Sequence, residues 1–428
     1  MAKLEGDVVT DLGFTPVETL SENRRANATV LGHVAVFAIG ATSAIQVMNF
    51  NATVLSVVCL LLVPAFLLMT HRGVEMLPLV LAVLGWISYL ASCLLNGVSV
   101  LWDNAVAPAS FSLYFIGLTV LTGRAVDRIA TVLAGLAAGT LVYFLTQGFP
   151  LSNTGSFLDL WKYGIASAVT ILILFALAIA RAPLLLHSVV LAVLGLASLG
   201  FNYRAHALVC LLASAVLFSR RFLGSRIRRG WQFAGIIAFG LLFAYVMPIA
   251  ARAGLFGPAL QSKTIEQQAT NLPILLAGRT EPPETFTAIM QRPLLGWGSA
   301  PKLTPDFYAQ AEHLAVRMGY APTFPFGLYW RLPTQANDSS ALHSILLGSW
   351  AEGGVLAVLL PAFLLVACIG VVWNNTRFGI WAPLAVTVAL QGIWDLLFSP
   401  WLYNAPAEYA CIALLYGAVH FRARPGGP

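Results

Sequence analysis

The chain has 428 residues, of which 58% are hydrophobic and only 10% are charged. Soluble domains carry about 25% charged residues, so this composition excludes an ordinary soluble enzyme and indicates an integral membrane protein. The net charge of +6 comes from basic residues scattered over short loops, so no nucleic-acid partner is expected.

The N-terminal segment and the cysteines add two further expectations. Residues 1–27 are polar and mixed in charge, without the apolar core of a cleavable signal peptide, so they are expected to form a tail. The five cysteines all lie within apolar runs. Their odd number and apolar surroundings predict buried, unreactive side chains and no disulfide.

A helix that crosses the bilayer needs about 20 predominantly apolar residues. Twelve stretches fit, which predicts an all-α membrane fold divided into 1–27 (tail), 28–250 (nine helices), 251–340 (a large loop), 341–421 (three helices) and 422–428 (tail). The predicted spans are 28–47, 51–69, 76–95, 105–121, 129–147, 163–180, 183–200, 203–219, 231–250, 341–371, 378–397 and 406–421. The tenth is too long for one straight helix, so a kink or a part outside the bilayer is expected.

The distribution of Lys and Arg predicts the orientation, because cytoplasmic loops are enriched in both. With the N-terminus inside, the cytoplasmic segments hold 15 of the 24 basic residues. The short outer loops hold only Lys162, and Arg204 lies at an outer helix end. The remaining seven lie in or beside the loop at 251–340, whose length exempts it from the rule. Both termini are therefore predicted to be cytoplasmic and the large loop extracytoplasmic.

Proline and acidic residues predict two helices inside this loop. The run Glu281-Pro282-Pro283-Glu284 is typical of a helix start, and Pro293 of a helix end. A second helix is expected to start at Thr304-Pro305-Asp306 and to end near Gly319. The expected apolar faces are Phe286, Ile289 and Met290 in the first helix, and Phe307, Ala311, Leu314 and Met318 in the second. The later aromatic residues Phe324, Phe326, Tyr329 and Trp330 suit an interface with lipid headgroups.

Many ionisable residues are predicted to lie at one depth, the outer edge of the membrane. Ionisable groups in membrane helices are costly and suggest a functional site, although interfacial anchoring and helix capping are the alternatives. The residues concerned are Asp159, Lys162, Arg204, His206, His343, Asp395 and Glu408. Glu352, inside the long tenth stretch, is expected to have a structural role and a buried partner.

Two arginines are candidates for binding phosphate. Arg204 lies directly ahead of an apolar helix, and an arginine side chain matches phosphate oxygens bidentately. The alternatives for Arg204 are an interfacial anchor or an ion pair with Asp395 or Glu408. Arg279 follows Gly278 in the loop, where a solvated surface arginine is the alternative. Its competitors for the same role are Arg292, Lys302, Arg317 and Arg331.

His343 is the candidate general base. It follows Asp338-Ser339-Ser340, which is typical of a helix N-cap, so His343 is expected in the first turn of a helix. The positive end of the helix dipole disfavours imidazolium, and a neutral imidazole can take a proton from a sugar hydroxyl. The alternative is a histidine that only helps to cap the helix. No second histidine follows at metal-ligand spacing, so neither a metal site nor a cofactor is predicted.

The order of several short motifs resembles the superfamily of O-antigen ligases and Wzy-type polysaccharide polymerases. The motifs are Asn202-Tyr203-Arg204 before a helix, Ala277-Gly278-Arg279, Pro293-Leu294-Leu295-Gly296-Trp297-Gly298, and Leu342-His343 followed by Glu352-Gly353-Gly354. The layout of twelve helices, with a large outer loop between the ninth and tenth, is also similar to that family.

The resemblance implies a glycosyltransferase of the GT-C type at the outer face of the bacterial inner membrane. Its donor would be a glycan on undecaprenyl diphosphate, and the transfer would be inverting and independent of metal. A polymerase would use another lipid-linked repeat unit as acceptor, whereas a ligase would use lipid A core. Arg204 and Arg279 would hold the diphosphate, and His343 would activate the acceptor hydroxyl. His206, Asp395, Glu408, Arg292 and Arg331 are the candidates for supporting roles, and polysaccharide export or chain-length proteins for further partners.

Polymerase is the favoured interpretation, although no sequence feature separates it from ligase. A transporter or flippase of lipid-linked glycans is the rival from another class. Transporters place polar residues near the bilayer midplane on broken helices in matching halves, whereas here they are predicted at the outer edge. A structural subunit of an export complex is a third interpretation, in which Arg204 and His343 would be replaceable.

The topology leads to the first prediction. In a cysteine-free background, a cysteine placed at Gln268 should react with an impermeant thiol reagent in intact cells. A cysteine placed at Ser225, within the cluster of arginines from 220 to 229, should react only after the cells are broken. The reverse pattern would contradict the orientation.

Overall fold

The computed structural model describes residues 30–47, 52–70, 73–101, 103–147, 157–222, 229–268, 281–299, 304–326, 330, 342–402 and 404–420. Within these ranges the chain is helical, with one isolated β-bridge between Gln46 and Thr53 and no strand. The five cysteines are free and buried, as predicted.

Each of the twelve predicted spans overlaps a helix of the described chain. The helices are one at Val30–Ala44, then α2 (Val54–Leu61), α3 (Val63–Leu67), α4 (Leu77–Asn96), α5 (Asp103–Thr122), α6 (Val126–Gln147), α7 (Phe157–Leu160), α8 (Ala166–Ile179), α9 (Leu184–Gly200), α10 (Arg204–Phe222), α11 (Arg229–Arg252), α12 (Pro258–Gln268), α13 (Glu281–Gln291), α14 (Pro305–Arg317), α16 (Ile345–Gly353), α17 (Leu359–Trp373), α18 (Ala382–Phe398) and α19 (Ala405–His420).

Six helical stretches of the described chain are long and apolar enough to cross a membrane. They are Gly73–Asn96, Asn104–Thr122, Val126–Gln147, Arg204–Phe222, Ala234–Arg252 and Asn375–Phe398. Four shorter apolar helices accompany them, at Val30–Ala44, Ala166–Ile179, Leu184–Gly200 and Leu359–Trp373. The chain is therefore a helical membrane protein, and the number of twelve spans stays a prediction.

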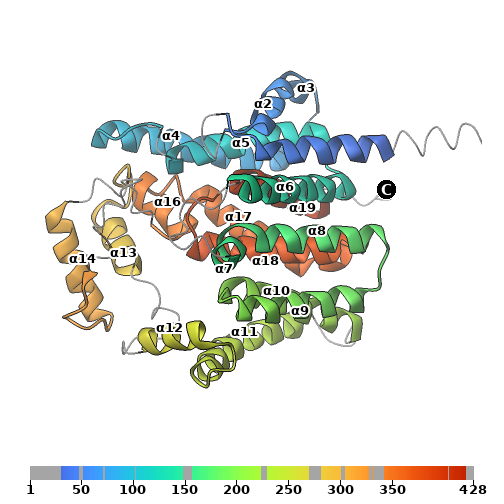
Figure 1. The fold of residues 1–428 in the computed structure, drawn as a ribbon. Coiled ribbons are helices and arrows are strands. Elements are labelled where there is room, and N and C mark those ends of the chain that lie inside the picture. Colours follow the sequence, from blue (N-terminus) through green and yellow to red (C-terminus); the bar gives the residue numbers. More distant parts are fainter. Residues whose placement is uncertain are drawn as a thin grey trace, which may run out of the picture.

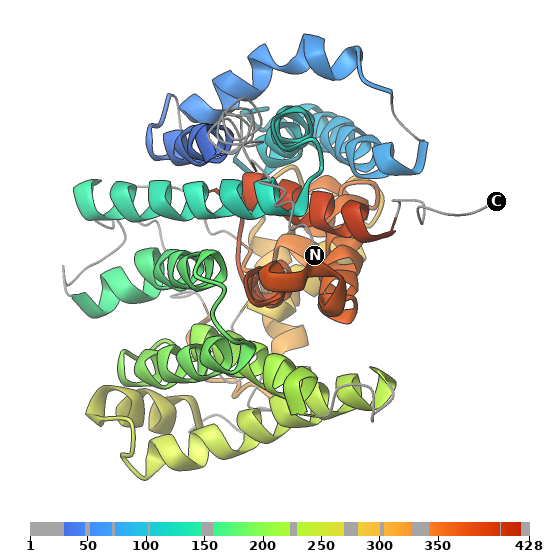
Figure 2. The same ribbon diagram turned by 90° about the vertical axis from the view of Figure 1, so that its right-hand side faces the viewer.

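The C-terminal helices occupy the middle of the bundle. Figure 2 shows α16–α19 (orange to red) between the N-terminal helices (blue) and the layer of α9–α12 (green to yellow). α19 packs on α5 and α6, and α18 packs on α17 and α10. Of the apolar stretch that ends with α18, 61% is buried inside the protein, whereas only 17% of the apolar stretch in α11 is buried. α11 is therefore a peripheral helix whose apolar side chains are available to lipid.

The helices of the large loop gather at one end of the bundle. In Figure 1 the long helices run across the picture, and α12, α13, α14 and α16 lie toward its left-hand side. The start of the helix at Val30–Ala44 and the end of α19 lie toward the opposite side.

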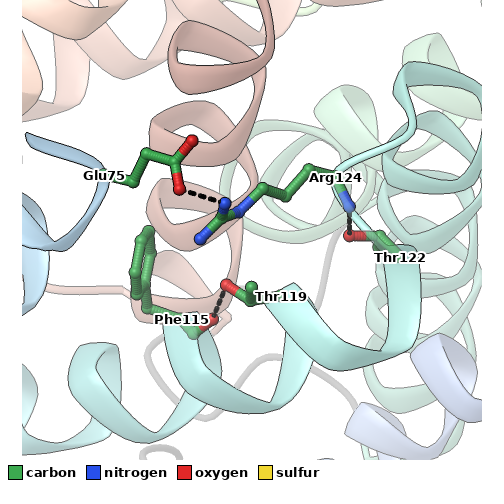
Figure 3. Close-up of polar contacts among 5 residues, drawn as sticks. All are labelled: Glu75, Phe115, Thr119, Thr122 and Arg124. Atoms are coloured by element: carbon green, nitrogen blue, oxygen red, sulfur yellow. Dashed lines mark hydrogen bonds and ion pairs between the residues drawn. The ribbon is translucent and has the colours of Figure 1, made fainter. Parts of the chain in front are cut away.

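An ion pair joins two helix ends far from this loop. Arg124, in the turn between α5 and α6, donates from Nη1 to Glu75 Oε2 in the short helix Gly73–Met76 (Figure 3). The turn gives Arg124 a positive φ of 61°, and its backbone N–H donates to Thr122 Oγ1 at 3.2 Å. This contact ties the start of α4 to the α5–α6 turn, on the side predicted to be cytoplasmic.

The two helices predicted in the loop are confirmed. α13 starts at Glu281 and ends before Pro293, and α14 starts at Pro305 with Thr304 Oγ1 accepting from the Phe307 N–H. In α14, Phe307 and Ala311 are buried as predicted, and Met318 is partly buried against them.

Two expectations about side chains in the loop are wrong. Phe286 and Met290 of α13 are 41% and 64% exposed, because the helix buries its opposite face, with Glu284 and Ala288, between α14 and α16. Phe326 and Trp330 do not form a headgroup interface. They are 4% and 2% exposed within a core that belongs to the loop itself. Tyr329 lies outside the described residues.

The long tenth stretch is broken into two helices. α16 ends at Gly353, and Gly354 has a φ of 79°, which an L side chain rarely adopts. The chain turns over residues 355–358 before α17 starts at Leu359. The kink that the length of the stretch predicted is thus produced by the glycine pair.

The segment 293–298 docks on the C-terminal end of α16. Trp297 N–H donates to Ala351 O at 3.0 Å and Gly298 N–H to Glu352 O at 2.8 Å. The Val355 N–H donates back to Leu294 O at 3.2 Å. A Cβ at Gly296 would overlap the Glu352 carbonyl, and one at Gly354 would overlap the Leu294 carbonyl. Two glycine motifs far apart in sequence therefore fit each other backbone to backbone.

Membrane helix α4 also holds this end of α16, through two serine side chains. Ser88 Oγ donates to Gly353 O at 2.7 Å, and Ser92 Oγ donates to Glu352 O at 2.8 Å. The last carbonyls of a helix lack intrahelical partners, so these bonds satisfy groups that burial would otherwise make costly.

The second prediction compares two glycines with positive φ. Gly354→Ala should destabilise the protein more than Gly379→Ala, because both introduce a strained φ but only position 354 also meets a carbonyl. The backbone strain alone costs about 1–3 kcal/mol. Thermal unfolding in detergent and proteolysis of the loop are the measurements. Equal effects of the two substitutions would show that the contact with Leu294 contributes nothing.

Candidate functional site

His343 forms a close polar pair with Glu281 of the loop. Its Nδ1 lies 3.1 Å from Glu281 Oε1, and the two side chains are 47% and 23% exposed. Glu281 is the first residue of α13, and His343 lies just before the N-cap of α16, so the α13–α16 contact brings them together. The pair is accessible to solvent and lies where α13 of the loop packs on α16.

The predicted position of His343 in a first helical turn is wrong. The N-cap of α16 is Ser344, whose Oγ accepts from the Leu347 N–H at 3.1 Å. His343 therefore precedes the cap and lies outside the helix. The run Asp338-Ser339-Ser340 lies outside the described residues. The group that the structure places beside the imidazole is the carboxylate of Glu281.

Two more carboxyl groups lie behind this pair. Glu284, one turn after Glu281, is 2% exposed, and Glu352 of α16 is 1% exposed. Asn104 Nδ2 of α5 donates to Glu352 Oε2 at 2.8 Å, which provides the buried partner expected for Glu352. Within the described ranges, no group of three His, Cys, Asp or Glu side chains is arranged to hold a metal ion.

The inner carboxyl of α13 holds its proton more tightly than usual. Burial, with the nearby charges of Glu281 and Glu352, raises the pKa of Glu284 to about 8. Glu281 also acts on Tyr320, whose pKa is raised to about 12, mainly by burial. The negative charge of Glu281 therefore acts on both Glu284 and Tyr320.

The end of α18 supports the segment that carries His343. Ser344 Oγ donates to Leu396 O at 3.1 Å. Next to it, Asp395 accepts from Gln391 Nε2 and from Ser399 Oγ, both at 2.9 Å. Asp395 is also an electrostatic neighbour of Glu408, at the start of α19. The structure thus brings Asp395 and Glu408 together, and Asp395 lies next to the residue that accepts from Ser344.

Arg204 is linked to another part of the loop. It is the first residue of α10, and its Nη2 donates to Thr264 Oγ1 of α12 at 2.9 Å. Thr264 is buried, and its hydroxyl donates in turn to Leu260 O. The guanidinium is therefore oriented by the first helix of the loop.

His206 lies behind Arg204 inside the bundle. It is 1% exposed, and its Nε2 lies 3.0 Å from Thr170 Oγ1 and 3.4 Å from Cys210 Sγ. Its ring stacks on Tyr203 with 5.4 Å between the ring centres. Substrate in an open site does not reach such a group, so His206 supports the start of α10 from inside.

The other loop arginines fall into two groups. Arg292 is exposed, donates to Asn96 Oδ1 at the end of α4, and places its guanidinium 3.9 Å from the ring centre of Trp297. These contacts fasten the docked segment 293–298 to the membrane helices. Arg279 and Arg331 lie outside the described residues, so their predicted roles stay predictions.

Sequence reasoning missed Glu281 as a site residue. It was interpreted only as an acidic residue at a helix start, which is also true. Its position two residues after Arg279 was a weak local signal. Its pairing with His343, 62 positions further on, depends on the α13–α16 contact and has no local signature.

No protein-family model matches the chain, and comparisons with characterised proteins and with solved structures also gave no match.

Proposed function

We propose that the chain is a membrane glycosyltransferase of the polysaccharide polymerase type, which transfers a glycan from undecaprenyl diphosphate to a sugar hydroxyl. The observation that supports this most is the His343–Glu281 pair. An accessible imidazole is paired with a carboxylate where a polar loop meets a lipid-embedded bundle. A substrate that is part lipid and part carbohydrate needs a site at such a boundary.

In the proposed mechanism, His343 acts as general base. Glu281 Oε1 accepts a hydrogen bond from Nδ1–H, which fixes the tautomer and leaves the Nε2 lone pair available. Nε2 takes the proton of the acceptor hydroxyl while its oxygen attacks the anomeric carbon. The bond from that carbon to the diphosphate oxygen breaks, and the diphosphate leaves with the electron pair.

The leaving diphosphate gains negative charge, which the arginines stabilise. Arg204, oriented by Thr264, binds phosphate oxygens from the bundle side, and Arg279 is proposed to bind them from the loop. Two positioned guanidinium groups take the place of a metal ion, and no cofactor is required. Glycan transfer on the outer side of the inner membrane follows from the predicted topology.

The third prediction tests the pair. His343→Gln should reduce transfer by about 10²–10⁴-fold, because an amide cannot take the proton. Glu281→Gln should reduce it less, because the imidazole stays but is held less firmly. The assay is purified protein with a lipid-linked repeat unit, analysed on a gel for a ladder and, with lipid A core added, for ligase product. The matched control is His313→Gln, which changes an exposed histidine of α14. Full transfer by His343→Gln would rule out His343 as the base.

The fourth prediction concerns the diphosphate. Arg204→Lys should fail to restore transfer, because the bidentate guanidinium is lost, while binding of the donor weakens. Transfer by the wild type should also survive EDTA. The control is Arg317→Lys, at the exposed end of α14. Inactivation by EDTA that Mg²⁺ reverses would contradict a mechanism based on arginine alone.

A further inference from the structure

Three carboxyl groups converge where α13 meets α16, and they do not have equivalent partners. Figure 1 shows α13 beside α16, with α14 on its other side. Glu281 is paired with His343, and Glu352 accepts from Asn104. The charges of Glu281 and Glu352 both act on the carboxyl group of Glu284, which is 2% exposed. Its Oε1 has no hydrogen-bond partner among the described residues, and neither does Oε2 of Glu281.

A fully ionised trio is physically unfavourable in this place. Burial penalises each carboxylate, and like charges on neighbouring groups add repulsion. Glu281 and Glu284 are three positions apart on one helix and therefore share a face. Among the described residues, neither a histidine nor an amide donor pairs with Glu284, in contrast to Glu281 and Glu352. Protonation of Glu284 therefore relieves the most repulsion among the three carboxyl groups.

We propose that Glu284 is a positioning residue: as a neutral carboxylic acid it allows the ionised Glu281 to stay on His343, and its ionisation displaces that carboxylate. The effect of Glu284 on catalysis rests on the proposed function, whereas its protonation can be measured without assuming that function. The groups facing this cluster are Glu281 on α13, His343 and Glu352 around α16, Tyr89 and Cys93 on α4, and Tyr320 after α14.

The sign of the pH effect follows from the direction of the shift. The pKa of Glu284 is raised to about 8, so the proton is held through neutral pH and lost between about pH 7 and 9. If only the protonated form keeps Glu281 in place, transfer should fall about 30-fold between pH 7 and pH 9.5 by simple titration. Because the folded protein raises the pKa of Glu284 above the ordinary value of about 4.5, its contribution to stability is fully present below that ordinary value, falls as pH rises, and is lost once pH has passed about 8.

The test combines two spectroscopic measurements with one kinetic measurement on full-length protein in nanodiscs. Infrared difference spectroscopy follows the carbonyl band of a protonated carboxylic acid from pH 6.5 to 9.5. NMR of ¹⁵N-histidine-labelled protein follows the Nδ1–H of His343, assigned by its absence in His343→Gln. The variants are Glu284→Gln, which keeps shape and neutrality, and the control Asp306→Asn, which changes an exposed carboxyl of α14.

The expected result is a carboxylic-acid band that disappears between pH 7 and 9 in the wild type and in Asp306→Asn, and is absent in Glu284→Gln. The Nδ1–H signal of His343 should be lost over the same range in the wild type and should persist at pH 9.5 in Glu284→Gln. The alkaline fall in transfer should be absent from Glu284→Gln. The absence of the band from Glu284→Gln assigns it to Glu284, and the His343 Nδ1–H signal of that variant at pH 7 shows that the variant is folded.

Two outcomes would overturn the proposal. One is the absence of the carboxylic-acid band at pH 7 in the wild type. The other is a His343 signal that does not change while Glu284 ionises. If both spectroscopic results are as expected but no form of the protein transfers glycan, the role of Glu284 in holding the pair is supported and the proposed glycosyltransferase activity is rejected.

Discussion

The backbone contact between segment 293–298 and the end of α16 is the constraint on which the candidate site depends. α13 leads directly into this segment, so the bonds from Trp297 and Gly298 to α16 fix one end of α13. The other end of α13 carries Glu281, which meets His343 at the start of α16. Because α16 has only nine residues, clamping one end also positions the other. The geometry of the pair is thus set by glycines that have no chemistry of their own.

The buried carboxyl group of Glu352, at the end of α16 where segment 293–298 docks, requires a polar partner. An apolar residue there would pack without cost, whereas a carboxylate needs the amide of Asn104 and so links α16 to membrane helix α5. Ser88 and Ser92 of α4 add donors to the neighbouring carbonyls. The loop is therefore attached to the bundle through hydrogen bonds at defined positions. Such bonds fix register more strictly than apolar contact between lipid-facing surfaces does.

The parts of the fold that local chemistry determines were predictable. Proline at a helix start and threonine at an N-cap act within a few residues, and α13 and α14 followed from them. The break before α17 followed from the length of the apolar stretch. The exposed Phe286 and the buried Phe326 and Trp330 were not predictable, because the core of the loop is chosen by α14 and α16 and not by the membrane. The cap of α16 at Ser344 was not predictable for the same reason, because the bond from Ser344 to Leu396 of α18 is a tertiary contact with no local signature.

The two halves of the proposed site share one support, α18. On one side α10, which carries Arg204, packs against α18, and Gln391 of α18 is the neighbour of His206. On the other side Leu396 of α18 accepts from Ser344, next to His343. Asp395 lies between these two contacts and accepts from Gln391 and Ser399, so its carboxylate orders the end of the helix from within.

α18 is among the most buried helices, so the spacing between the arginine and the histidine is fixed by the rigid centre of the bundle and not by the loop. The loop then needs only to bring Glu281 to the histidine and Thr264 to the arginine, two contacts that it makes with separate helices.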